Sequence, residues 1–291
     1  MKSQKSTNAT SAKLFLVGTP IGNLEDMTYR AIRILQEADA IAAEDTRNTI
    51  KLCNHFSIKT PLISYHEHEL EKGGERILSM LSEGKTIALV SDAGMPCISD
   101  PGYDIAVKAI AEGYDVVPVP GANAAISALV ASGIETQPFT FIGFVQRKKK
   151  ERLEQLEQLK MREETLIFYE APHRLKETLK ALLDTFGGKR KIALARELTK
   201  RYEEFLRGTL NEAVQWAATN EVRGEFCIIV EGYQGGYEEQ TDWWKGLSIR
   251  AHVEVVMEKD GIPSKEAIKW VAAERRLPKR DVYQAYHIEN E

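Results

Sequence analysis

Short apolar runs alternate with amphipathic runs along most of the 291 residues, and this alternation constrains the fold more than any other feature. Apolar runs typical of buried strands occur at residues 14–17, 40–43, 86–90 and 115–119. The segments between them, such as residues 29–38, place apolar side chains three and four positions apart, which favours helices. Alternation of this kind predicts an α/β fold, with a largely parallel sheet and helices on its faces.

A second unit of similar character begins near residue 121. Strand-like runs are expected at residues 139–144, 165–169, 192–195 and 226–231, and helices at 122–131, 149–161 and 172–186. The directions in which these strands pair stay open. Beyond a Gly- and Glu-rich segment, three short helical patterns cover residues 247–259, 264–275 and 280–287, with Ser264 as a candidate cap. They fit either a helix-turn-helix or a small packing bundle.

These patterns predict the domain organisation. We expect a disordered tail over residues 1–12, α/β domains over 13–120 and 121–233, a linker over 234–243, and a small helical extension over 244–291.

Composition excludes several classes of protein. The net charge of −4 excludes a strongly basic coat for nucleic acid, although a local basic groove stays possible. Three widely spaced cysteines, without a Cys-x-x-Cys pair, support neither a disulfide framework nor a zinc site. The histidines His66 and His68 lack a third ligand, so we expect no metal. No apolar run is long enough to span a bilayer, and no signal peptide precedes the first strand, so we expect a cytoplasmic protein.

The strand ends carry more glycine and proline than an ordinary connection needs. Residues 91–102, SDAGMPCISDPG, follow one strand-like run and precede a helical pattern. Such a junction exposes backbone groups to a ligand in the crevice beyond the sheet, or it is simply a rigid turn. Similar junctions at 17–24 and 119–125 are neither Gly-x-Gly-x-x-Gly nor Walker A, which argues against a nicotinamide dehydrogenase.

Other junctions carry charge. Residues 43–47, AEDTR, have adjacent acids for proton transfer, or an Asp45 or Thr46 that only caps the next helix. Charged groups also follow the runs that end near residues 169 and 195. Five of residues 146–152 are cations, and such a run is either a solvated helix start or a phosphate-binding rim. Cations oppose the dipole at a helix N-terminus, so we favour the functional interpretation.

Six motifs together, in this order, resemble the tetrapyrrole methylase superfamily of S-adenosylmethionine-dependent enzymes. They lie at residues 18–24, 44–47, 91–102, 120–122, 170–174 and 196–200. The closer resemblance is to members that methylate 16S rRNA, and it spans about residues 14–233 and, more loosely, the C-terminal helices. It implies a two-domain tetrapyrrole-methylase-like fold with the methyl donor between the domains, and a homodimer. It also implies 2′-O-methylation of a cytidine ribose in the decoding centre of the small ribosomal subunit. Cys97 and Cys227 depart from the pattern but are conservative in size.

The resemblance also implies site residues. Those for S-adenosylmethionine are Pro20, Asp92, Ala93, Gly94, Met95, Pro96, Ser99, Ala122, Ala124, Ala125, Ala171 and Pro172, with residues 224–226 closing the cleft. A ribose hydroxyl is a poor nucleophile, so a general base or a cation near the developing oxyanion would help. The candidates are Glu44, Asp45, His173 and Lys200. The expected phosphate contacts are Arg47, Arg147, Lys148, Lys149, Lys150, Arg174 and Arg196.

Two alternatives stay open. A methylase of a tetrapyrrole or another small molecule on the same fold would need a wide apolar cleft, and the basic run at 146–152 argues against it. A non-enzymatic protein that binds RNA or the ribosome would need no donor pocket, so tight binding of S-adenosylmethionine would exclude it.

Overall fold

The computed structural model describes residues 4, 12–66, 70–235, 244, 246–275 and 277–287. The chain forms two compact units, Met1–Tyr233 and Gln234–Glu291. Most of the predicted tail over 1–12 and of the predicted linker over 234–243 lies outside the described residues. No helix in the described part of the chain is both long and apolar enough to cross a membrane.

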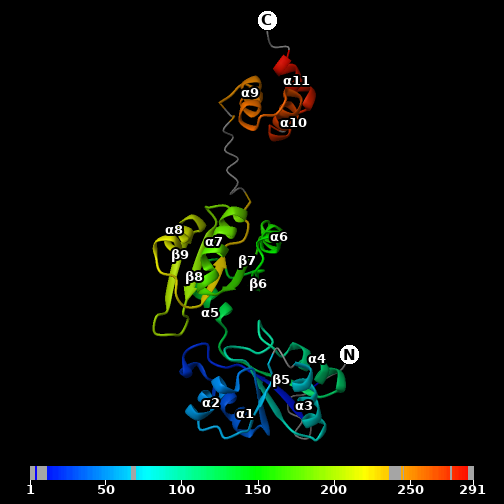
Figure 1. The fold of residues 1–291 in the computed structure, drawn as a ribbon, viewed down its shortest axis with the longest axis vertical. Coiled ribbons are helices and arrows are strands. Elements are labelled where there is room, and N and C mark those ends of the chain that lie inside the picture. The colour runs from blue at the N-terminus through cyan, green and yellow to red at the C-terminus, as the bar shows by residue number, and fades with distance from the viewer. Residues whose placement is uncertain are drawn as a thin grey trace. The chain divides into compact units, whose positions relative to one another are not determined.

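The first half of the larger unit, blue to blue-green in Figure 1, contains a five-stranded sheet. Its strand order is β3-β2-β4-β1-β5, and all of its pairings are parallel. Its strands are β1 (Lys13–Val17), β2 (Ala40–Ala43), β3 (Leu62–Ser64), β4 (Ile87–Val90) and β5 (Asp115–Val119). Its helices are the short 3-10 helix η1 (Leu24–Asp26), α1 (Tyr29–Glu37), α2 (Thr46–His55), α3 (Leu70–Ser82) and α4 (Tyr103–Glu112). Because β4 and β5 flank β1, the loops that follow these three strands meet at one edge of the sheet.

Apolar side chains from each strand alternate between two cores, because successive residues point to opposite faces. On one face Val17, Ile41 and Val90 pack with α1 and α2, and on the other Leu14 and Leu89 pack with α3 and α4. The backbone N–H of Arg47 donates to the Asp45 carboxylate 2.8 Å away, so Asp45 does cap α2 as the simpler alternative predicts.

The second sheet has the order β6-β7-β10-β8-β9. Its strands are β6 (Phe139–Phe144), β7 (Thr165–Glu170), β8 (Lys191–Arg196), β9 (Glu204–Thr209) and β10 (Phe226–Val230). Within this sheet β6 and β7 pair in parallel, and the other described pairings are antiparallel, which settles the directions that the sequence leaves open. A bulge interrupts β6 between Phe141 and Gly143.

Helices cover both faces of this sheet. One face packs against α5 (Ala124–Ser132) through Ala128 and Leu129. The other packs against α6 (Lys149–Leu159), α7 (Pro172–Phe186) and α8 (Leu210–Thr219). Neither β9 nor α8 is predicted by the sequence analysis, although Thr209 and Glu212 form a complete capping box at the start of α8.

The smaller unit contains α9 (Ile249–Asp260), α10 (Ser264–Glu274) and α11 (Lys279–His287) around a core of its own that includes Val253, Ile268 and Val282. Pro263 is the N-cap residue of α10, which corrects the expected cap at Ser264, and no side chain caps that helix.

Candidate functional site

Three loops at the edge of the first sheet are joined by backbone contacts. The backbone N–H of Thr19 donates to the carbonyl of Gly94 at 2.8 Å, and that of Gly94 donates back to Thr19 at 3.1 Å. Gly18 and Gly121 approach so closely that a Cβ on Gly121 would lie 2.9 Å from the Gly18 Cα. The glycines at this edge therefore allow the loops after β1, β4 and β5 to form one wall.

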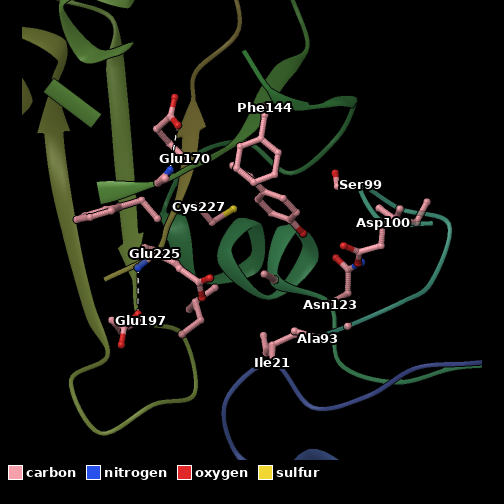
Figure 2. Close-up of a pocket in the computed structure, with 18 of the residues that line it drawn as sticks. Ile21, Ala93, Ser99, Asp100, Asn123, Phe144, Glu170, Glu197, Glu225 and Cys227 are labelled. Carbon is pink, nitrogen blue, oxygen red and sulfur yellow. Dashed lines mark hydrogen bonds between the residues drawn. The ribbon is translucent and has the colours of Figure 1, made fainter. Parts of the chain in front are cut away.

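A cavity of about 250 Å³ lies between this wall and the second sheet (Figure 2). The first sheet contributes the loops around Ile21 and residues 93–100. The second contributes the ends of β6, β7, β8 and β10 and the loop after β8. The cavity is the crevice that the glycine- and proline-rich strand ends predict.

The loops that line the cavity hold unusual backbone conformations. Cys97, Ser99, Glu197 and Thr199 have φ values of 72°, 63°, 51° and 65°, although none is a glycine. Residues in this region of φ cost of order 1 kcal/mol or more and persist where surrounding contacts impose them. In the bulge of β6, a Cβ on Gly143 would lie 3.3 Å from the Ser99 hydroxyl, so the strand passes close to this loop.

Asp100 lines the cavity on the side of the first sheet, next to Ser99 (Figure 2). Burial, reinforced by the negative charges of Glu44 and Asp92, raises the pKa of the Asp100 carboxyl to about 6, against a lowering by the Ser91 hydroxyl. Asp92 itself is exposed, and its carboxylate accepts from the backbone of Asp45 and from the Asn48 amide. Asp100 is therefore more basic than an ordinary aspartate.

The opposite wall carries a cation between two carboxylates. The Lys200 ammonium lies 3.0 Å from a Glu197 oxygen and 2.9 Å from a Glu225 oxygen. Burial lowers the pKa of Lys200, but the hydrogen bonds to Glu225 and Glu197 outweigh it, so the net shift is upward. The backbone of Gly22 lies against the Lys200 side chain, since a Cβ added to Gly22 would lie 2.5 Å from the Lys200 Cγ. Lys200 is thus a fixed cation and a poor proton acceptor.

Aromatic side chains close the floor of the cavity. The rings of Phe141 and Phe144 contact Tyr169 edge-on, with centroids 5.0 and 5.9 Å away. The Tyr169 hydroxyl accepts from the backbone N–H of Ala125 at 3.1 Å. Burial raises the pKa of both Tyr169 and Cys227 to about 12, so both side chains are protonated at neutral pH.

Glu170 ties the cavity to the basic run. Its fully buried carboxylate accepts from the backbone of Ala171 at 2.9 Å and from the Thr178 hydroxyl at 2.6 Å. The Arg174 guanidinium lies 3.5 Å from it and donates to the carbonyl of Val145 at 2.7 Å. This network fixes the start of α7 to the loop that leads into α6.

The structure brings some of the expected residues together and separates others. Expected donor or catalytic residues that line the cavity are Ala93, Gly94, Met95, Ser99, Ala124, Ala171 and Lys200. Expected residues that do not line it are Pro20, Asp92, Pro96, Ala122, Ala125, Pro172, Glu44, Asp45 and His173. Ala125 is buried against the second sheet, and His173 is exposed at the start of α7. Arg47 holds Asp45, and its hydrogen bond lowers the pKa of that carboxyl to about 2, which makes Asp45 a weak base.

The residues expected to contact phosphates fall into an exposed group and a partly buried group. Arg147, Lys148, Lys149 and Lys150 are exposed at the start of α6, and the side chains of Lys148 and Lys150 keep 81% and 87% of their surface. By contrast, Arg174 is 16% exposed and bonded within the chain. Arg196 is 22% exposed and donates to the carbonyl of Arg223. These two guanidiniums are therefore engaged in bonds within the chain, while the lysine side chains are largely exposed.

The lining of the cavity carries an excess of negative charge. Four carboxylates line the cavity, and Arg174 neutralises the one on Glu170. The other three, on Asp100, Glu197 and Glu225, outnumber the one cation of the described lining, the Lys200 ammonium. A pocket with this excess suits a ligand that carries positive charge and disfavours phosphate. The described side chains contain no cluster suited to a metal ion.

Several groups that line the cavity are not predicted from the sequence. Asp100, Asn123, Tyr169, Glu197 and Cys227 line it but are not among the expected site residues. Three of the five, Asp100, Asn123 and Glu197, lie in the junctions or motifs described above, and Tyr169 immediately precedes another, so the sequence does point to this region. What the motifs lack is the direction in which each side chain points.

The fold and this cavity define a class of protein. A family model described as Tetrapyrrole (Corrin/Porphyrin) Methylases matches residues 13–214. A solved uroporphyrin-III C-methyltransferase from Thermus thermophilus, complexed with S-adenyl homocysteine, has the same fold. Its TM-score is 0.55 at 18% identity, over 76% of this chain and 97% of that one. The chain belongs to the tetrapyrrole methylase family, as the resemblance implies.

Comparison with individual relatives assigns the chain to a narrower family. The chain is 58% identical to the ribosomal RNA small subunit methyltransferase I of Halalkalibacterium halodurans, over 99% of this chain and 100% of the relative. It is 56% identical to the Bacillus subtilis protein of that name, over 99% of each. The chain therefore belongs to the ribosomal RNA small subunit methyltransferase I family.

Proposed function

We propose that this chain transfers a methyl group from S-adenosylmethionine to the 2′-hydroxyl of a cytidine ribose in the decoding centre of 16S rRNA. The observation that carries the proposal is the separation of charge at the site. Carboxylates predominate in the cavity, while cations stand exposed at residues 147–150. The relatives' name supplies the substrate class, and the ribose position comes from the family resemblance.

The donor fits the cavity by its charge. When bound, S-adenosylmethionine supplies an electrophilic methyl group on a sulfonium, and its sulfonium and ammonium outweigh its carboxylate. Asp100, Glu197 and Glu225 give the matching negative excess, and the Gly94 backbone, with a φ of 81°, leaves the wall open for close approach. Holding the two reactants in line supplies much of the rate of a direct displacement.

Binding of the RNA requires positive charge, in contrast to binding of the donor. The phosphates of the RNA are repelled by the acidic cavity and attracted by the lysines of residues 148–150, so the strand would lie along the start of α6 while one ribose enters the cavity. Folded small subunits supply shape recognition, which allows a protein with a net charge of −4 to bind them through a local patch.

Two measurements on the unmodified protein test the function. We expect calorimetry to show binding of S-adenosylmethionine, and small subunits from cells lacking this protein to gain one ribose methyl group in 16S rRNA. Binding without transfer to RNA would favour the small-molecule methylase, and no binding would favour the non-enzymatic RNA-binding protein.

We also propose that the protein is a homodimer that works in the cytoplasm. The resemblance implies the dimer, and α4 exposes apolar side chains on one face, at Tyr103, Val107 and Ile110. Sedimentation equilibrium at micromolar concentration should give twice the chain mass of 32.7 kDa. A single-chain mass would contradict the proposed dimer.

A further inference from the structure

Asp100 differs from the other carboxylates of the cavity in what surrounds it. Glu170 is bound by Arg174, and Glu197 and Glu225 share Lys200. Among the described residues, Asp100 forms no ion pair, and its charged neighbours are the acids Glu44 and Asp92. A carboxylate in such surroundings keeps its affinity for a proton, because no cation stabilises its ionised form.

The position of Asp100 is fixed by the backbone on both sides. Cys97 and Ser99 adopt positive φ, and the Cys97 N–H donates to the carbonyl of Pro101 at 3.2 Å, which closes a tight loop around Asp100. Figure 2 shows the carboxylate on the opposite side of the cavity from Glu197 and Glu225. It therefore faces the cavity as a preorganised group.

We propose that Asp100 accepts the proton of the ribose hydroxyl during methyl transfer, an assignment that rests on the proposed function. The hydroxyl oxygen forms a bond to the methyl carbon as the carbon–sulfur bond breaks, and the electron pair of that bond stays on sulfur. The hydroxyl proton passes to an oxygen of Asp100. The products are a methyl ether, a neutral thioether and a protonated carboxyl group.

The other ionisable groups of the described lining do not fit this role. Lys200 is a cation held by two carboxylates, and those carboxylates are already occupied by it. Tyr169 and Cys227 hold their protons up to a pKa of about 12. Asp100, with a pKa of about 6, is ionised at neutral pH and still more basic than a solvated aspartate, which suits a general base.

The test compares Asp100→Asn and Asp100→Glu with the unmodified protein, and uses Asp104→Asn as the matched control. Asp104 is an exposed carboxylate in the first turn of α4 that does not line the cavity. We expect Asp100→Asn to lose about 10²- to 10⁴-fold in single-turnover methyl transfer to small subunits. The rates are compared at saturating S-adenosylmethionine, so that donor affinity lost with the carboxylate's charge does not enter the comparison. Asp100→Glu should recover part of that loss, and the control should match the unmodified protein.

The pH profile separates a base from a merely structural carboxylate. The rate of the unmodified protein should rise with pH and level off above about 6, while Asp100→Asn should lack this rise. Ser91→Ala is a second variant that keeps the carboxylate. It removes the hydroxyl that lowers the pKa of Asp100, so the rise should move to higher pH.

Thermal melting supplies a readout independent of activity. Because the folded pKa of Asp100 is raised above the usual 3.8 of an aspartate, the unmodified protein should lose stability relative to Asp100→Asn as the pH rises through about 6. Equal rates and equal pH profiles for the unmodified protein and Asp100→Asn would overturn the assignment. If Asp100→Asn does not fold, an unmoved profile in Ser91→Ala would overturn it instead. Absence of any ribose methylation by the unmodified protein would refute the proposed function itself.

Discussion

Replacing Glu170 with alanine removes the acceptor at the centre of a buried network. Two donors, the Ala171 N–H and the Thr178 hydroxyl, lie 2.9 and 2.6 Å from its carboxylate, and the Arg174 guanidinium lies 3.5 Å away. Hydrogen bonds to a charged group contribute about 1.5–3 kcal/mol each. The two short bonds therefore give about 3–6 kcal/mol, and the carboxylate's own desolvation offsets part of it.

Loss of one partner from a buried pair typically destabilises by about 3–5 kcal/mol, because it leaves the other charge uncompensated. In a unit of this size, each kcal/mol shifts the melting temperature by about 2–4 °C, so we expect a fall of about 6–20 °C in differential scanning calorimetry.

The matched control lies on α7, the helix whose Thr178 donates to Glu170. Asp184 forms an exposed i,i+4 pair with Lys180, with side chains 52% and 62% exposed, so Asp184→Ala should change stability by less than about 1 kcal/mol. Glu170→Ala should also weaken binding of small subunits, because Arg174 loses its anchor and the loop before α6 is no longer fixed. A melting temperature for Glu170→Ala within about 2 °C of the control would refute the reasoning.

Three further variations test other parts of the molecule. Gly22→Ala should push Lys200 away from the cavity wall and weaken S-adenosylhomocysteine binding in calorimetry, and unchanged affinity would contradict the close contact between them. Replacing lysines 148–150 with alanine should reduce the salt dependence of RNA affinity by about 2 in the log–log slope while donor affinity stays the same. An unchanged slope would remove these lysines from the RNA interface. Burial lowers the pKa of His252, so protonation opposes folding; stability of the C-terminal unit should be complete above pH 6.5 and decline below it, as hydrogen exchange at pH 5 and 7 would report.

The parallel half of the fold is predicted well because its signals are local. Strands β1, β2, β4 and β5 are short apolar runs, and the pleat alone places their side chains in two cores. The edge strand β9 is missed because its sequence, EFLRGT, is mixed in polarity and none of its residues is fully buried. Its pairing with β8 provides the reason for its conformation, and that contact is not visible in the sequence.

The site is predicted by segment but not by side chain. Residues of the motif at 91–102 do line the cavity, yet Asp92, and not Asp100, is the residue that the resemblance implies for the donor. Both are aspartates in the same junction. Only the fold determines that Asp92 points to Asn48 while Asp100 faces the cavity beside Tyr169. Arg174 is a second example, because the sequence does not distinguish an arginine that binds phosphate from one that donates to a backbone carbonyl within the chain.

The bulge in β6 makes the shape of the cavity depend on the length of that strand. In a regular strand, positions 141 and 144 would face opposite sides, because side chains alternate. The extra residue near Gly143 restores the phase, so both rings reach Tyr169. Loss of one residue there would turn Phe144 to the other face and remove part of the floor of the cavity. A variant of this chain with one residue more or fewer in β6 should therefore have a cavity of a different shape.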